Sequence, residues 1–186
     1  MHISGSFCAR PVNVFIGKLL GVGAFTVLLC FSALIRIPLP FTPVPITLQN
    51  MAAFLAGAVL GPSLGLSAVL LYLSLGMAGA PLFANTGAGF LYLFGPTGGY
   101  LFGFMAAAWL IGCLTRFFKT SNFFALYAIM LAGVVAVYVL GGLWLFLGIA
   151  WSAKKIFFLG IAPFIAPDAV KAFLAAVLYK SVTQKG

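Results

Sequence analysis

Asp168 is the only acidic residue of the 186-residue chain, and Lys171 follows it within an apolar stretch. Residues three apart on a helix project from one face, so the carboxylate and the ammonium can pair. Asp168 also follows Pro167 at the predicted start of a helix, where the macrodipole favours a carboxylate. Burying either ion in hydrocarbon costs about 2.5–3.5 kcal/mol.

This charged pair has two interpretations. It is either a self-neutralising pair that fixes the end of a helix, or a polar contact for a ligand at the floor of a cavity. We favour the ligand, because a pair needed only for structure could be replaced by leucine at lower cost.

Uncharged polar residues supply a second set of candidates. An amide donates and accepts hydrogen bonds, which suits a neutral heterocycle. For Asn85 a ligand contact and a local structural role are equally compatible with the sequence. For Thr47, Gln49 and Asn50 we favour helix capping. Four aromatic residues could stack on a ligand or anchor the protein at a membrane interface: Phe83, Phe90, Tyr92 and Tyr100.

A glycine-dense turn, Gly95-Pro96-Thr97-Gly98-Gly99-Tyr100, precedes a predicted helix. Backbone N–H groups of such a turn can hold an anion or a carbonyl. It is not a nucleotide loop, because no Lys-Ser or Lys-Thr follows the glycines. Its small residues could equally allow close helix packing. Packing is also favoured for three Gly-x-x-x-Gly pairs: Gly17 with Gly21, Gly57 with Gly61, and Gly99 with Gly103.

Histidine and cysteine are too sparse for a metal site. His2 is the sole histidine, and Cys8, Cys30 and Cys113 have no metal-ligand spacing. We therefore predict free or buried thiols, no metal and no cofactor. With one Asp and no histidine in the spans, an intramembrane enzyme is disfavoured.

The amino-acid composition indicates a protein that lies in a membrane rather than in water. Hydrophobic residues make up 64% of the chain and charged residues 6%, with a mean hydropathy of +1.22. A soluble domain has about 25% charged residues, so a water-soluble globule is excluded. The ten cations are scattered and form no basic stripe, which argues against nucleic-acid binding.

The pattern predicts an all-α integral membrane protein, with residues 1–186 forming a single transmembrane domain. Its six transmembrane helices are expected at about 14–35, 47–60, 64–78, 98–117, 123–147 and 167–180. The first is predicted to be a retained helix, because Arg36-Ile37-Pro38 follows it rather than a signal-peptide cleavage site. Four prolines between Arg36 and Pro45 predict an extended loop.

The cations set the expected orientation. With both termini in the cytoplasm, six cations lie inside: Arg10, Lys18, Arg116, Lys119, Lys180 and Lys185. Three lie outside: Arg36, Lys154 and Lys155. The outward connections are then 36–45, 79–95 and 154–166, which are also the most irregular. Their clustering on one side suggests a lidded cavity, since non-helical backbone at membrane depth survives only where it is buried or lines a cavity.

Several motifs together resemble one family. Pro43-Val44-Pro45-Ile46-Thr47-Leu48-Gln49 resembles the segment before the second helix of BioY proteins, the biotin-binding S components of energy-coupling-factor (ECF) transporters. Leu55-Ala56-Gly57 with Gly61-Pro62, the run from Gly95 to Tyr100, and Pro167-Asp168 with Lys171 resemble its later motifs in the same order. The resemblance covers about residues 37–178.

The resemblance implies a six-helix subunit of the bacterial inner membrane that captures biotin from outside. Such a subunit is not an enzyme; it docks on a coupling protein driven by paired ABC-type ATPases. By the family's pattern, Asn85, Asp168 and Lys171 would meet the ureido ring, and the thiophane ring would lie near Gly89 and Tyr92.

The first helix offers only a partial match to the docking motif of such subunits. S components often carry a small-x-x-x-small alanine motif on the first helix for docking, and here only Gly17 and Gly21 approach it. The sequence is compatible with a subunit that works alone or with the ATPases, and with a monomer or a homo-oligomer. The alternatives are an S component for another vitamin, such as thiamine, and a structural subunit without a ligand. A cationic vitamin would prefer more than one acid.

Overall fold

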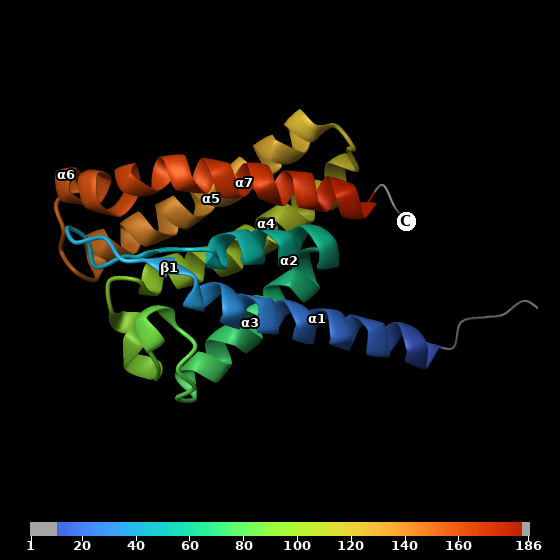
Figure 1. The fold of residues 1–186 in the computed structure, drawn as a ribbon, viewed down its shortest axis with the longest axis horizontal. Coiled ribbons are helices and arrows are strands. Elements are labelled where there is room, and N and C mark those ends of the chain that lie inside the picture. Colours follow the sequence, from blue (N-terminus) through green and yellow to red (C-terminus); the bar gives the residue numbers. More distant parts are fainter. Residues whose placement is uncertain (1–10, 184–186) are drawn as a thin grey trace, which may run out of the picture.

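The computed structural model describes residues 11–183, with side chains from residue 15 onward. His2, Cys8, Arg10 and Lys185, which enter the sequence predictions, lie outside the described residues. The chain folds into packed helices joined by short irregular segments (Figure 1). The helical fold class predicted from the sequence is confirmed.

The elements follow one another with few long connections. In chain order they are α1 (Pro11–Leu34), β1 (Arg36–Ile37), β2 (Ile46–Thr47), α2 (Gln49–Leu60), α3 (Pro62–Met77), two 3-10 turns (Ala84–Thr86 and Phe90–Phe94), α4 (Gly98–Phe118), α5 (Phe123–Leu147), α6 (Ala153–Lys155), a π-helical segment (Ile156–Ile161) and α7 (Ala162–Thr183).

Four helical stretches of the described chain are long and apolar enough to cross a membrane. They are Phe15–Leu34, Gly98–Phe118, Phe123–Leu147 and Ala153–Thr183. Helices α2 and α3 are also apolar but have only 12 and 16 residues. A crossing helix needs about 20 residues, and fewer where it is packed inside a bundle.

The proline-rich segment after α1 forms a short hairpin. Arg36 pairs with Thr47 and Ile37 with Ile46 in an antiparallel register. The prolines between the two strands have no N–H to donate, so they keep this segment out of a helix. The extended loop predicted here is confirmed, and it brings Val44 against the helices as a buried residue.

The last helical stretch begins much earlier than predicted. It runs from Ala153 through the π-helical turns into α7, and Pro167 lies inside the helix. The predicted start at 167 and the irregular 154–166 connection are therefore wrong. Helices in a bilayer tolerate proline because neighbouring helices and local π turns satisfy the freed backbone groups. Asp168 is consequently far from a helix start, and the macrodipole expectation is wrong.

Glycines set the closest helix contacts. A Cβ on Gly57 of α2 would lie 2.1 Å from the Ala108 carbonyl oxygen of α4, and one on Gly103 would lie 2.8 Å from Val137 Cα of α5. The packing role predicted for these glycines is confirmed. Gly17 differs, because a Cβ there would meet no atom within 4 Å.

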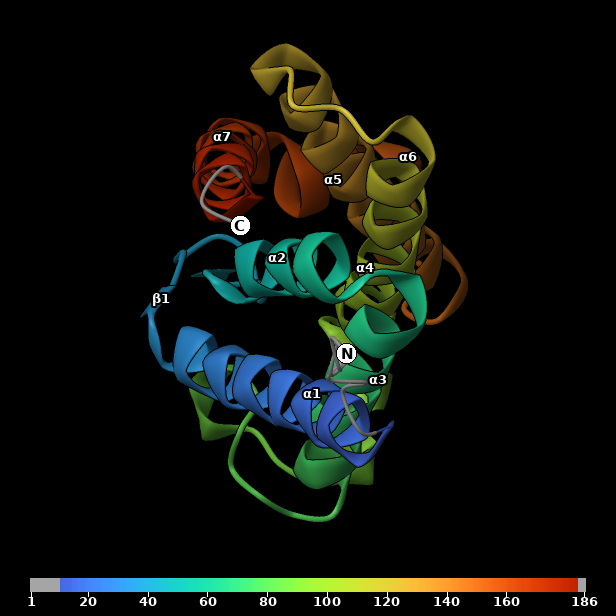
Figure 2. The same ribbon diagram turned by 90° about the vertical axis from the view of Figure 1, so that its right-hand side faces the viewer.

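The two described ends of the chain lie at the same end of the molecule, which faces the viewer in Figure 2. The hairpin loop, the 79–95 segment and α6 gather at the opposite end (Figure 1). Helix α2 lies between α1 and α7 in both views and contacts both. Its first turn and the middle of α7 therefore meet inside the bundle, beneath the irregular segments.

Candidate ligand-binding site

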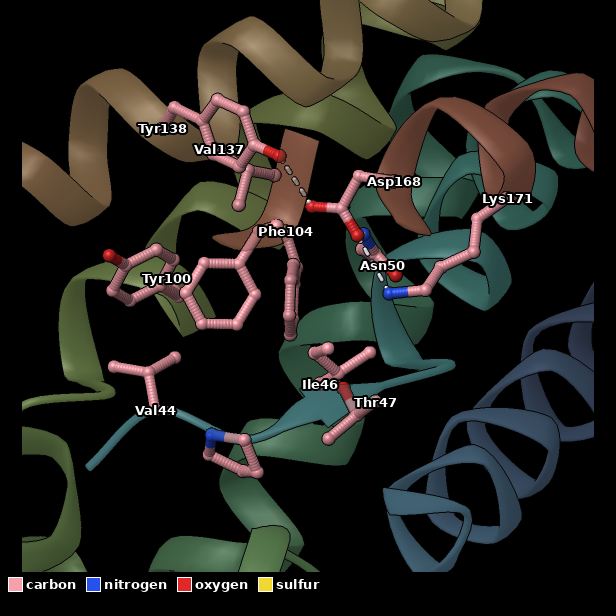
Figure 3. Close-up of a pocket in the computed structure, with 12 residues that line it drawn as sticks. Val44, Ile46, Thr47, Asn50, Tyr100, Phe104, Val137, Tyr138, Asp168 and Lys171 are labelled. Atoms are coloured by element: carbon pink, nitrogen blue, oxygen red, sulfur yellow. Dashed lines mark hydrogen bonds and ion pairs between the residues drawn. The ribbon is translucent and has the colours of Figure 1, made fainter. Parts of the chain in front are cut away.

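A small hollow lies where the hairpin meets four helices (Figure 3). Its volume is about 40 Å³, enough for a few water molecules. The lining combines apolar and polar side chains from α2, α4, α5, α7 and the segment before α2: Val44, Pro45, Ile46, Thr47, Asn50, Tyr100, Phe104, Val137, Tyr138, Phe164, Asp168 and Lys171.

The Asp168 carboxylate is the polar centre of this hollow. Lys171 Nζ donates to its Oδ1 at 2.7 Å, which confirms the predicted pairing. Asn50 Nδ2 of α2 donates to the same oxygen at 2.9 Å, and the Tyr138 hydroxyl of α5 donates to Oδ2 at 2.9 Å. One carboxylate thus receives donors from three helices, as Figure 3 shows.

Both charges are enclosed by protein. Asp168 is 4% exposed and Lys171 is 6% exposed. A buried ion pair is stable only when its remaining donors and acceptors are also satisfied. A carboxylate offers about four lone-pair positions and an ammonium three hydrogens. After these three hydrogen bonds, one carboxylate position remains, and so do two hydrogens of Lys171, so the site can accept and donate at once.

A second hollow of about 40 Å³ adjoins the first. It shares five lining residues with the first: Val44, Pro45, Thr47, Tyr100 and Phe104. Tyr92, Gln49 and Thr97 also line it. The two hollows therefore share a wall that includes part of the Val44–Thr47 segment.

Gln49, which is buried, and Thr47, which is half-buried, form a polar chain beside the second hollow. The Thr47 hydroxyl donates to Gln49 Oε1 at 3.2 Å, and Gln49 Nε2 donates to the Tyr72 hydroxyl. The Tyr72 hydroxyl in turn donates to the Leu82 carbonyl at 3.0 Å. The capping role favoured for Gln49 is therefore wrong: its side chain links α2 to α3.

The candidate residues of the 79–95 segment lie away from the Asp168–Lys171 pair. Asn85 is exposed, has a left-handed backbone (φ 62°) and lines neither hollow. Gly89 also lines neither, and its N–H donates to the Gly76 carbonyl at 2.8 Å. Tyr92 lines the second hollow and stacks on Phe83 at 4.9 Å. The structure thus brings Asp168 and Lys171 together and leaves Asn85 apart from them.

The glycine turn before α4 serves packing. A Cβ on Gly98 would lie 1.7 Å from the Leu93 carbonyl oxygen, and one on Gly99 would lie 2.1 Å from Trp144 Cβ. The N–H groups of Gly98 and Tyr100 donate to carbonyls of the turn itself. These contacts support the packing interpretation of the turn over the anion site.

Sequence reasoning missed two partners of Asp168. Asn50 was assigned to capping, and Tyr138 was not singled out. Tyr138 did carry a signal, because a tyrosine in the apolar span Phe123–Leu147 must find a partner for its hydroxyl. Asn50 carried a similar one, since an amide in the first turn of an apolar helix is costly unless it is bonded.

Together, the apolar helices and the enclosed carboxylate–ammonium pair define a helical membrane protein with a polar binding site between its helices. The chain belongs to the BioY family, whose sequence profile matches residues 9–185. The resemblance stated from the motifs is confirmed. Membership and the apolar spans make the chain a multi-pass integral membrane protein of the bacterial inner membrane.

Named relatives support the assignment. The chain is 40% identical over 161 residues to "Biotin transporter BioY" of Thermotoga maritima, covering 87% of this chain and 92% of the relative. It is 37% identical over 143 residues to "Probable biotin transporter BioY" of Pyrococcus horikoshii, covering 77% and 83%.

A solved structure has the same fold. It is the crystal structure of "the S-component for biotin from an ECF-type ABC transporter". The two chains superpose with a TM-score of 0.87 at 30% identity, and the match covers 94% of each.

Proposed function

We propose that this protein is the biotin-binding S component of an ECF-type vitamin transporter and captures biotin from the extracytoplasmic side. The observation that carries the proposal is the buried Asp168–Lys171 pair, which lines a hollow between the helices instead of facing lipid. Family membership supports the same function.

The chemistry of the pair suits the ureido group of biotin. That group has two N–H donors and one carbonyl acceptor. Asp168 supplies the acceptor for an N–H, and Lys171 retains hydrogens for the carbonyl. Both contacts are charge-assisted, which makes them about twice as strong as neutral hydrogen bonds.

The rest of the proposed site comes from the outward segments. We place Asn85 at the ureido ring and the thiophane ring against Gly89 and Tyr92. Pockets that hold a drug-sized ligand have volumes of about 300–1,000 Å³, far more than the two hollows of about 40 Å³ each. Binding therefore requires the Val44–Thr47 segment and the 79–95 segment to move, which would join the hollows and bring Asn85 inward.

The proposed topology is a single domain, residues 1–186, with six transmembrane helices and both termini in the cytoplasm. The common location of the two described ends supports an even number of crossings. The two short helices α2 and α3 pack against other helices, which supports counting them as crossings.

The proposed partners are a transmembrane coupling protein and paired ABC-type ATPases, and the subunit itself is not an enzyme. Gly17 on α1 has open space beside it, whereas a Cβ on Gly21 would lie 2.9 Å from Leu60 Cδ2. Of the two glycines considered for docking, Gly17 is the one that leaves a surface free.

A vitamin panel tests the proposed ligand. The purified protein is expected to bind biotin and to be indifferent to thiamine, because one carboxylate already paired with Lys171 is a poor partner for a cation. Isothermal titration with each vitamin, followed by competition against biotin, measures this. Displacement of biotin by thiamine would identify a different S component, and heat from neither vitamin would indicate a subunit without these ligands.

A further inference from the structure

An apolar groove runs along α4 and α5, on residues that line neither of the two small hollows. Three hollows of about 500, 540 and 430 Å³ make up the groove. Ala132 lines the first two and Leu140 the last two, so the groove is continuous. It opens outward, because at least half of the surface of Val135, Val139 and Leu143 is exposed. In a membrane such a groove faces the acyl chains of lipids.

Three alanines of α5 form one end of the groove. Ala125, Ala128 and Ala132 are spaced three and four residues apart, so they share one helix face. They line the first hollow together with Leu114 and Phe118 of α4. Ten residues of helix from Ala125 rise about 15 Å, which is half of a hydrocarbon core about 30 Å thick. This part of the groove therefore matches the acyl chain of a lipid from one leaflet.

The same end of the groove is polar and basic where α4 turns into α5. Thr120 lines the groove, and the exposed Lys119 precedes it. The Thr120 hydroxyl oxygen accepts from the Asn122 N–H at 3.1 Å, and its own hydrogen has no acceptor among residues 11–183. Helix α5 begins at Phe123, and its macrodipole favours an anion there. An ammonium, a hydroxyl and a helix N-terminus thus come from adjoining residues at one end of the groove.

Lys119 has no acidic side chain of this chain to neutralise it. Asp168 is the only acidic residue, and it is buried against Lys171. Arg116, the other cation near this turn, is directed to α2, where its Nη2 donates to the Leu60 carbonyl at 3.0 Å. The counter-charge of Lys119 therefore comes from outside the chain. Basic sites between helices on the cytoplasmic side of a membrane bind anionic lipid headgroups.

We propose that the α4–α5 groove binds an anionic phospholipid, with one acyl chain along the alanines of α5 and the phosphate at Lys119 and Thr120. The α4–α5 turn lies at the same end of the molecule as the described chain ends (Figure 1), which is the cytoplasmic end in the proposed topology. A zwitterionic lipid fits the groove equally well, but its headgroup has no net charge for Lys119. The proposed biotin site shares none of these residues, so the two proposals are tested independently.

The test is native mass spectrometry of the purified chain in detergent, titrated with phosphatidylglycerol or phosphatidylcholine of identical acyl chains. Wild type is expected to bind one phosphatidylglycerol about fivefold more tightly than phosphatidylcholine, which is the contribution of one cation near an anionic headgroup. Lys119→Gln is expected to lose this preference and to keep its affinity for phosphatidylcholine. Ala128→Leu, which fills the groove and leaves Lys119 in place, is expected to lose tight binding of both lipids.

Lys18→Gln and Ala24→Leu are the matched controls, because both residues are exposed on α1, outside the groove. Both variants are expected to bind the two lipids like wild type, and unfolding temperatures in lipid-free detergent check that every variant is folded. Equal affinity of wild type for the two lipids, or an unchanged preference in Lys119→Gln, would overturn the proposal. A stable dimer that binds no lipid would also overturn it, because a second copy of the chain would then occupy the groove. Displacement of phosphatidylglycerol by inorganic phosphate would show that the acyl chain contributes nothing, which also contradicts the proposal.

Discussion

Replacing Lys171 by methionine is expected to lower the free energy of unfolding by about 3–5 kcal/mol and to abolish biotin binding. The reason is the enclosure of Asp168, which is 4% exposed. Without the ammonium, its carboxylate keeps only the neutral donors of Asn50 and Tyr138. Thermal unfolding in detergent and titration with biotin measure the two losses. Lys180→Met on the same helix is the control and is expected to change neither.

The double variant Asp168→Asn/Lys171→Met separates structure from function. Removing both charges together is neutral or stabilising in many proteins, because no unpaired ion remains. We therefore expect the double variant to regain most of the stability lost in Lys171→Met while still failing to bind biotin. Recovery of both stability and binding would mean that the pair serves only to fix α7, as the alternative interpretation holds.

Gly57→Leu is expected to have the other large effect, on assembly of the fold. A Cβ at Gly57 would lie 2.1 Å from the Ala108 carbonyl oxygen and 2.9 Å from Ala108 Cα. These are backbone atoms, so α2 and α4 must separate to accommodate any side chain. Overpacking on this scale costs about 3 kcal/mol or more. The yield of folded protein and its unfolding temperature in detergent report the effect.

Gly17→Leu is the matched control for this change. It introduces the same side chain on a helix, but a Cβ on Gly17 would meet no atom of another segment within 4 Å. Leucine also has a higher helix propensity than glycine by several tenths of a kcal/mol, so this variant should be as stable as wild type. Equal destabilisation by the two substitutions would show that close packing of α2 on α4 is not what Gly57 provides.

Much of the fold follows from the apolar composition and from the glycine and proline residues that separate the helices. The apolar runs, the prolines between Arg36 and Pro45, and Gly61-Pro62 locate α1 to α5 to within a few residues. The predicted start of the last helix is wrong because it rests on the rule for soluble proteins, in which proline breaks a helix. In a bilayer, Pro167 can remain inside a helix. Ser152, whose hydroxyl accepts from the Lys155 N–H, was the better sign of the true start.

The site was predictable only in part, for a physical reason. The spacing of Asp168 and Lys171 is local on one helix, so the pair could be inferred directly. Asn50 lies 118 positions away from Asp168 and Tyr138 lies 30 away. Their convergence depends on how α2, α5 and α7 pack, which no local pattern encodes. Asn85 was inferred from a motif, and the exposed position that it has here makes its role dependent on movement of the 79–95 segment.

The central claim is that Asp168 is kept within the membrane for a ligand. Titration of biotin into purified wild type and Asp168→Asn tests this most directly. Asparagine keeps the shape of the side chain and removes the charge that accepts the ureido N–H. We predict one-to-one binding by wild type and an affinity at least about a hundredfold weaker in the variant. Equal affinity of the two proteins would contradict the account.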